Sequence, residues 1–221
     1  MRTNSLLRAT AAFAGALVLL TANGAGAAVS PTQALLTRVG ILPGDLQKGF
    51  TVKLVPGGAA LTDPSFDNCN YSFTTEAQRT ARRQLRVVAP NGVEQPIDSE
   101  AVAYKTPAAA AKAMVEWRAS VAGCKPLTWM KGKVPSDDVR IDSASNRTDL
   151  TLPIKDNTDT NILFRPRGAK VSYRVLIISQ RKGNVITTVL VYTAAKPVPG
   201  DVAALQFLAK QTGQRMAAAV R

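Results

Sequence analysis

The sequence predicts an α+β fold: a mostly antiparallel β-sheet packed by helices and built from two ββα-type halves. In each half of the chain, two extended segments joined by a short turn are followed by an amphipathic helix. This repeat of pattern predicts hairpins that pair into one sheet, with the helices packed on it. Of the 221 residues, 46% are hydrophobic, which is enough for a packed core and argues against a disordered chain.

Residues 1–27 are predicted to be a secretory signal peptide. Arg2 and Arg8 precede an apolar run over 11–20, and a small-x-small cleavage site follows at 25–27. The apolar run is shorter than the about 20 residues that a membrane-spanning helix needs, and no later segment is long and apolar enough to span. An uncleaved amphipathic anchor is the alternative. We therefore expect a secreted, extracytoplasmic protein in which residues 28–221 form a single domain with a net charge of +11.

The first half of the chain opens with a short helix capped by Ser30-Pro31, followed by a strand over 49–55. Two extended segments then surround an Asn91-Gly92 turn, at 84–89 and 98–104. Thr106-Pro107 begins a helix, and Gly123 is placed to end it. Four of its apolar residues have helical spacing on one face: Ala110, Met114, Trp117 and Val121.

The second half repeats this order, with a strand over 171–180, a turn over 181–184 and a β-branched strand over 185–193. A final helix follows Pro199-Gly200 and is capped by Asp201. Its predicted buried stripe consists of Val202, Leu205, Leu208, Met216 and Val220. Residues 125–170, between the halves, are polar and predicted to be irregular, with one or two short strands near 139–141 and 161–164.

The two cysteines, Cys69 and Cys124, are predicted to form one structural disulfide. Export places them in an oxidising compartment, where a lone pair of cysteines is most simply bridged. A catalytic thiol or a redox pair is the alternative. Neither has a histidine to form a thiolate, and the C-x-x-C spacing is absent.

No histidine occurs in the sequence, which removes the commonest general base, the Ser-His-Asp and Cys-His pairs and most zinc sites. Ser179 to Lys182 has the S-x-x-K spacing of serine acyl-enzymes, but it runs from a predicted strand into a turn and lacks the partner motifs. Residues 156–161 lack the glycine and glutamate of a calcium loop and fit an Asx-rich surface turn. We expect no enzyme activity, no cofactor and no metal.

Paired carboxylates are the remaining way to build a hydrolase. Glu116 is expected on the exposed side of its helix. Glu76 and Glu100 are left as possible members of a site, although nothing in the sequence brings them together.

Basic residues give the candidate binding site. Arg79, Arg82, Arg83 and Arg86 recur at i, i+3, i+4 and i+7, which would align them on one face if the segment stays helical as far as Arg86. A row of guanidinium groups can hold carboxylates or phosphates bidentately. The alternative is a solvated helix flank whose arginines pair with acids such as Asp67 and Glu76. Nucleic acid is not expected as a partner, because the protein is exported, only 5% of residues are aromatic and no recognition motif is present.

Three blocks of the sequence together resemble the PknH-like family of actinobacterial extracellular sensor domains, which is named for the extracellular domain of a mycobacterial receptor kinase. The similarity covers most of 31–125 and, as a pattern of elements, 170–220. The blocks are Leu35-Leu36 with 41–50, Cys69 with 71–84, and 100–104 with 109–117 and Cys124. The resemblance implies an α+β sensor-like domain with a cleft for an unidentified envelope ligand and no enzymatic activity. This chain departs from it by having one cysteine pair and no kinase.

These observations predict a secreted, non-enzymatic ligand-binding domain of the cell envelope, with an anionic or amphiphilic ligand beside the four arginines. The first alternative is a structural protein that adheres to anionic wall polymer by diffuse charge, and the second is an envelope hydrolase. The identity of the ligand and the oligomeric state do not follow from the sequence.

Overall fold

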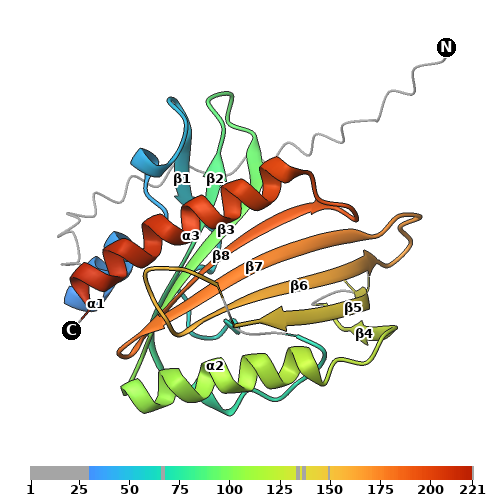
Figure 1. The fold of residues 1–221 in the computed structure, drawn as a ribbon, viewed down its shortest axis with the longest axis horizontal. Coiled ribbons are helices and arrows are strands. Elements are labelled where there is room, and N and C mark those ends of the chain that lie inside the picture. The colour runs from blue at the N-terminus through green and yellow to red at the C-terminus, as the bar shows by residue number, and fades with distance from the viewer. Residues whose placement is uncertain (1–29, 66–67, 133–134, 136–137, 149, 221) are drawn as a thin grey trace, which may run out of the picture.

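One antiparallel β-sheet organises the protein in the computed structural model (Figure 1). The structure describes residues 30–65, 68–132, 135, 138–148 and 150–220, so the predicted signal peptide lies outside the described residues. Within these ranges the sheet has eight strands in the order β1-β2-β3-β8-β7-β6-β5-β4. Their bounds are β1 Thr51–Leu54, β2 Arg79–Val88, β3 Glu94–Tyr104, β4 Thr128–Met130, β5 Val139–Arg147, β6 Asn157–Pro166, β7 Tyr173–Lys182 and β8 Val185–Ala194.

The predicted α+β fold with two ββα units is confirmed. The hairpin of β2 and β3 leads into α2 (Pro107–Ala122), and the hairpin of β7 and β8 leads into α3 (Pro199–Ala219). The second strands of the two hairpins, β3 and β8, pair with each other over residues 97–103 and 185–191. The two halves therefore meet inside the sheet, where β3 and β8 have neighbouring strands on both sides and are largely buried on both faces.

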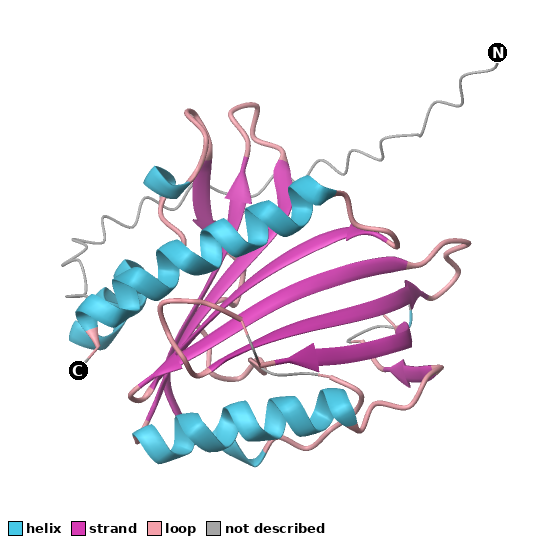
Figure 2. Cartoon of the chain, in the orientation of Figure 1, coloured by secondary structure: helices cyan, strands magenta, loops and turns pink. Residues whose placement is uncertain are grey.

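The helices cover opposite faces of the sheet (Figure 2). Along β7, Val175 and Ile177 pack into the core beneath α2, whereas Leu176 and Ile178 pack into the core beneath α3. A shorter helix, α1 (Pro31–Val39), lies beside α3. We call the two sides of the sheet the α2 face and the α3 face. None of the helices in the described ranges is long and apolar enough to cross a membrane.

The ends of α1 and α2 follow the predicted capping pattern, whereas the start of α3 differs from it. The Ser30 Oγ accepts a hydrogen bond from the backbone N–H of Gln33, at 3.2 Å, at the start of α1. Thr106 does the same for α2, and Gly123 ends that helix. The prediction that Asp201 is the N-cap of α3 is wrong, because the helix already begins at Pro199 with Val198 as its N-cap; from the first turn, the Asp201 carboxylate accepts the N–H of Val198. These bonds satisfy donors that a helix start leaves without a partner.

The predicted stripe on α3 is largely confirmed. Its members Leu205, Leu208, Met216 and Val220 are buried, but Val202 is 39% exposed because it lies near the open first turn of the helix.

The segment between the halves contains more sheet than the sequence predicted. In place of short strands, β5 and β6 pair over eight residue positions, and β6 pairs with β7 over eight more. The sequence of β6 does not show a clear alternation of apolar and polar residues, because two of its buried positions are the polar residues Thr158 and Thr160. Both are buried although polar, each with a hydrogen bond to its hydroxyl group.

The helix that would align the four arginines does not form, because residues 79–88 are strand β2, which contains most of the extended segment predicted at 84–89. This segment pairs with β3 along its length. Because successive side chains of a strand point to opposite faces, Ala81, Leu85 and Val87 are all buried on the α3 face. The spacing that suggested one helical face therefore divides the arginines between the two faces of a sheet.

The predicted disulfide between Cys69 and Cys124 is confirmed, with a Cα–Cα distance of 5.5 Å. Cys124 directly follows the C-cap of α2, and Cys69 lies in the loop that precedes η2 (Thr74–Gln78). The bridge therefore ties this loop to the end of α2, on the α2 face of the sheet.

Candidate functional site

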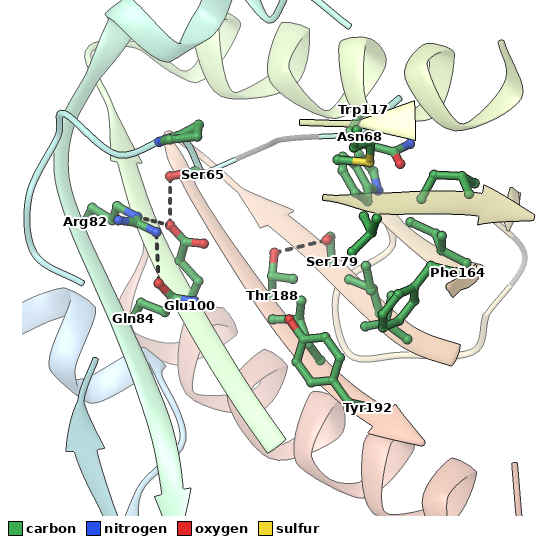
Figure 3. A pocket seen from close by; sticks show the side chains of 18 residues that line it. Ser65, Asn68, Arg82, Gln84, Glu100, Trp117, Phe164, Ser179, Thr188 and Tyr192 are labelled. Atoms are coloured by element: carbon green, nitrogen blue, oxygen red, sulfur yellow. Dashed lines mark hydrogen bonds and ion pairs between the residues drawn. The ribbon is translucent and has the colours of Figure 1, made fainter. Parts of the chain in front are cut away.

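A cavity of about 310 Å³ lies on the α2 face, between the sheet, α2 and the loop residues Pro64, Ser65 and Asn68 (Figure 3). Volumes of about 300–1,000 Å³ are typical of sites for small molecules. The cavity exists because α2 crosses only part of this face, so that the central strands are left for a loop to cover. It is the candidate functional site.

Most of the cavity wall is apolar. The Trp117 indole donates its N–H to the hydroxyl of Thr160, at 3.0 Å, so the ring borders the cavity with its polar atom already satisfied. The remaining apolar wall comes from Met130, Val139, Ile141, Ile162, Phe164, Val175, Ile177 and Leu190. These side chains could receive an alkyl chain or a ring.

One row of polar side chains crosses the sheet beneath the cavity. Gln84 on β2 is directly opposite Glu100 on β3, Glu100 is opposite Thr188 on β8, and Thr188 is opposite Ser179 on β7. Directly opposite residues of an antiparallel pair project from the same face, and all four side chains line the cavity. The hydroxyls of Thr188 and Ser179 are 3.0 Å apart and share a hydrogen bond. We call Gln84, Glu100, Thr188 and Ser179 the polar row.

An ion pair closes one end of the polar row. Arg82 is 4% exposed, and its Nε donates to the Glu100 Oε1, which also accepts the hydroxyl of Ser65 at 2.7 Å. Burial raises the pKa of the Glu100 carboxyl, and the guanidinium of Arg82 opposes that rise. Arginine keeps its charge at any ordinary pH, so Glu100 is the counter-ion of a permanent buried cation.

The rest of the Arg82 guanidinium is also occupied. Its Nη2 donates to the side-chain oxygen of Gln84 at 2.9 Å, and its Nη1 faces the carbonyls of Gly57 at 3.3 Å and Ala60 at 3.5 Å. Arg82 therefore holds the loop after β1 against the sheet. It is a structural cation at the edge of the cavity.

The structure separates the four predicted arginines, and of these only Arg82 lines the cavity. Arg79 is buried, forms an ion pair with the half-buried Glu76 and donates to the backbone carbonyls of residues 61, 63 and 76. Arg86 forms a bidentate pair with Asp98 and also bonds Glu94. Arg83 is opposite Ala101 and projects from the other face. The four are not a continuous guanidinium row.

Two carboxylates that the sequence could not connect do lie together. Ser65 donates its backbone N–H to Glu76 at 2.8 Å and its hydroxyl to Glu100 at 2.7 Å. Each of these carboxylates is paired with an arginine, Glu76 with Arg79 and Glu100 with Arg82. They act here as the counter-ions of buried cations.

The prediction that Glu116 is exposed is wrong. This side chain is buried because its carboxylate holds η2 against α2, accepting hydrogen bonds from the backbone and hydroxyl of Thr75 at 3.1 and 2.7 Å and from the Thr74 hydroxyl. Burial alone would raise the pKa of Glu116, but these bonds outweigh it and hold that pKa below its usual range.

The polar row could not be identified from the sequence. Thr188 lies in a β-branched segment typical of any core strand, and Ser179 drew notice only through an S-x-x-K spacing that β7 and its turn do not support. Only the register between strands aligns these residues. Among the described residues, no group of three or more acidic or cysteine side chains could hold a metal ion.

Comparisons with known proteins find similarity among solved structures only. No family model matches the chain, and no curated protein matches its sequence. Among solved structures, the chain is similar to the extracellular domain of PknH from Mycobacterium tuberculosis, with a TM-score of 0.47 and 9% sequence identity. The match covers 82% of this chain and 96% of that domain. The family resemblance stays a prediction.

Proposed function

We propose that residues 28–221 form an exported, non-enzymatic binding domain that takes an amphiphilic ligand into the cavity on the α2 face. The observation that supports this is the division of the cavity wall. One side is formed by Trp117 and aliphatic side chains, and the other by the polar row. A ligand with an alkyl or ring portion and one polar group satisfies both sides at once.

The chemistry of the cavity supports binding over catalysis. The sequence has no histidine, and the two neighbouring carboxylates are each neutralised by an arginine. Ser65 donates its hydroxyl to Glu100 in an ion pair that is already formed, so Glu100 is not poised to activate it as a nucleophile. The disulfide supports an oxidising, extracytoplasmic location.

The proposal can be tested by titration of Trp117 fluorescence. The chain has two tryptophans, and Trp129 is 39% exposed, so Trp129→Phe leaves emission from the cavity alone. In this background we expect saturable changes with at least one of three probes that share a chain length: decan-1-ol, decylamine and decanoate. Saturation by none of them would refute the proposal.

A cavity-filling variant provides the matched control. Val175 lines the cavity, and Val175→Phe should abolish the saturable change because the larger ring occupies the space of the alkyl chain. Val171→Phe makes the same substitution at a residue that is 58% exposed and does not line the cavity, and should leave binding unchanged. Equal binding by the two variants would place the probe outside the cavity.

A second candidate function, adhesion to an anionic polymer, is favoured by the exposed basic residues at one end of the sheet. Lys125, Lys170 and Lys196 are exposed near the ends of β4, β7 and β8. The Debye length, over which exposed charges interact, shortens from about 10 Å at 0.1 M salt to about 3 Å at 1 M. Retention of the protein on poly(glycerol phosphate) should therefore disappear over that range of salt. Binding of decan-1-ol in the cavity should not.

A further inference from the structure

We infer that the cavity selects amphiphiles whose polar group is a hydrogen-bond donor, an alcohol or an ammonium, and discriminates against carboxylates. This inference rests on the proposed function and adds to it the chemistry of the ligand's head. It reverses the expectation of an anionic ligand that arises from the net charge and the arginine spacing. Three features of the polar end support it.

The first feature is that the cation beside the cavity is already satisfied. A guanidinium has five N–H donors, and Arg82 directs them at the Glu100 carboxylate, the Gln84 side chain and two loop carbonyls. A ligand carboxylate would have to displace one of these acceptors from a buried charge. Arg82, one of the four arginines that suggested an anionic ligand, therefore has few donors left to bind one.

The second feature is a carboxylate oxygen that faces the cavity. The Glu100 Oε1 accepts from both Ser65 and Arg82, whereas no described residue bonds its Oε2. Figure 3 shows this second oxygen directed into the cavity, on the side of Thr188. An ionised carboxylate can only accept hydrogen bonds, so it would bind a hydroxyl or an ammonium and repel a second carboxylate.

The third feature is the set of hydroxyls around that oxygen. Thr188 and Ser179 use one proton between them for their mutual bond, and the Tyr192 hydroxyl points toward Thr188 in Figure 3. Hydroxyls both donate and accept, so this group can complete the bonds of an alcohol whose proton is given to Glu100. Burial, and to a smaller extent the nearby Asp98, raises the pKa of Tyr192, so this hydroxyl keeps its proton and can donate it.

Head-group selectivity is measured with the same three decyl probes. Decan-1-ol and decylamine should bind at least about tenfold more tightly than decanoate, a ratio that corresponds to about 1.4 kcal/mol. Tightest binding by decanoate would overturn the inference and leave the proposed function standing. Absence of saturation by all three would refute the proposed function itself, so the two failures are distinguishable.

Glu100→Gln tests the assigned atom. The amide keeps an oxygen to accept from Ser65 and Arg82, but the negative charge is lost and Arg82 is left uncompensated. We expect affinity for decanoate to rise and affinity for decylamine to fall, each about tenfold, while decan-1-ol changes least. Glu76→Gln is the matched control, because Glu76 also bonds Ser65 and an arginine but does not line the cavity. An unchanged order of affinities in Glu100→Gln would overturn the inference.

Thr188→Val provides a second test that leaves the ion pair intact. The side chains have nearly the same shape, and the variant removes a hydroxyl from the polar row beside Glu100. Affinity for decan-1-ol should fall about tenfold, and the thermal unfolding curve shows whether the variant is folded. A folded variant with wild-type affinity for decan-1-ol would overturn the assignment of the head group to the polar row.

Discussion

Removal of the disulfide should cost about 4 kcal/mol of stability, and this loss should arise in the unfolded chain. Cys69 and Cys124 are separated by 55 residues. The chain-entropy relation for a closed loop of that length gives about 14 cal/mol/K, or about 4 kcal/mol at 25 °C. The perturbation is the double variant Cys69→Ala with Cys124→Ala, which leaves no thiol to react.

The assay is urea unfolding followed by tryptophan fluorescence, which yields both the free energy of unfolding and its dependence on urea. The free energy should fall by about 4 kcal/mol. The slope with urea should rise, because an unfolded chain without the cross-link is less compact and exposes more surface. Near-UV circular dichroism of the folded variant should stay close to wild type, since the cross-link acts mainly by restricting the unfolded chain.

Two results would refute this reasoning. A loss below about 1 kcal/mol would mean that the unfolded chain is already compact around these residues. A large loss with an unchanged slope and an altered near-UV spectrum would locate the effect in the native loop, where Cys69 and Asn70 have φ angles of 54° and 57°. Such a left-handed conformation is costly for Cys69, whereas asparagine tolerates it, and the bridge would then be needed to hold Cys69 in place.

Three further predictions concern the supports of the site. Gly58→Ala should lose about 1–3 kcal/mol in urea unfolding, because its Cβ would lie 2.8 Å from two backbone oxygens, whereas Gly44→Ala, with open space around it, should be nearly neutral. Glu116→Gln should lose about 1–3 kcal/mol, since an amide cannot accept every bond that the two threonines of η2 donate; a loss within error would show that η2 does not depend on them. Burial alone would raise the pKa of Asp156, but hydrogen bonds from two arginines hold it below its usual range, so this carboxylate contributes stability above about pH 4 and loses it as the pH falls through the lowered value. Asp156→Asn should therefore be less stable than wild type at neutral pH, with the difference narrowing in urea unfolding below pH 4, and a difference that widens there would contradict the sign.

The sequence predicts those parts of the fold whose signals are local. The Thr106-Pro107 start of α2 and its apolar face depend on neighbours within a few residues, and both are confirmed. Likewise, the hairpin of β7 and β8 consists of two apolar segments, the second strongly β-branched, on either side of a turn signal at 181–184.

Features set by long-range pairing were missed or misread. The arginine segment satisfies a helical period and a strand period together, and pairing with β3 decides for the strand. The polar row joins Gln84 to Ser179 through three strand pairings, and no local pattern encodes that alignment. Burial of Glu116 depends on η2, a segment about 40 residues earlier in the chain, and no local pattern predicts that η2 packs against α2.

The mismatch in width between the sheet and its helices has a consequence for how such a protein could change its ligand. Eight strands at about 4.8 Å spacing extend about 34 Å across, whereas one helix is about 10 Å wide. On the α2 face, the cavity beside α2 is covered by the loop between β1 and η2, which is held in place by one disulfide and by buried arginines. Lengthening or shortening that loop would change the size of the cavity without altering any strand pairing. The size of the cavity can thus change while the strand pairing stays the same, provided that the disulfide and the buried arginines of the loop are kept.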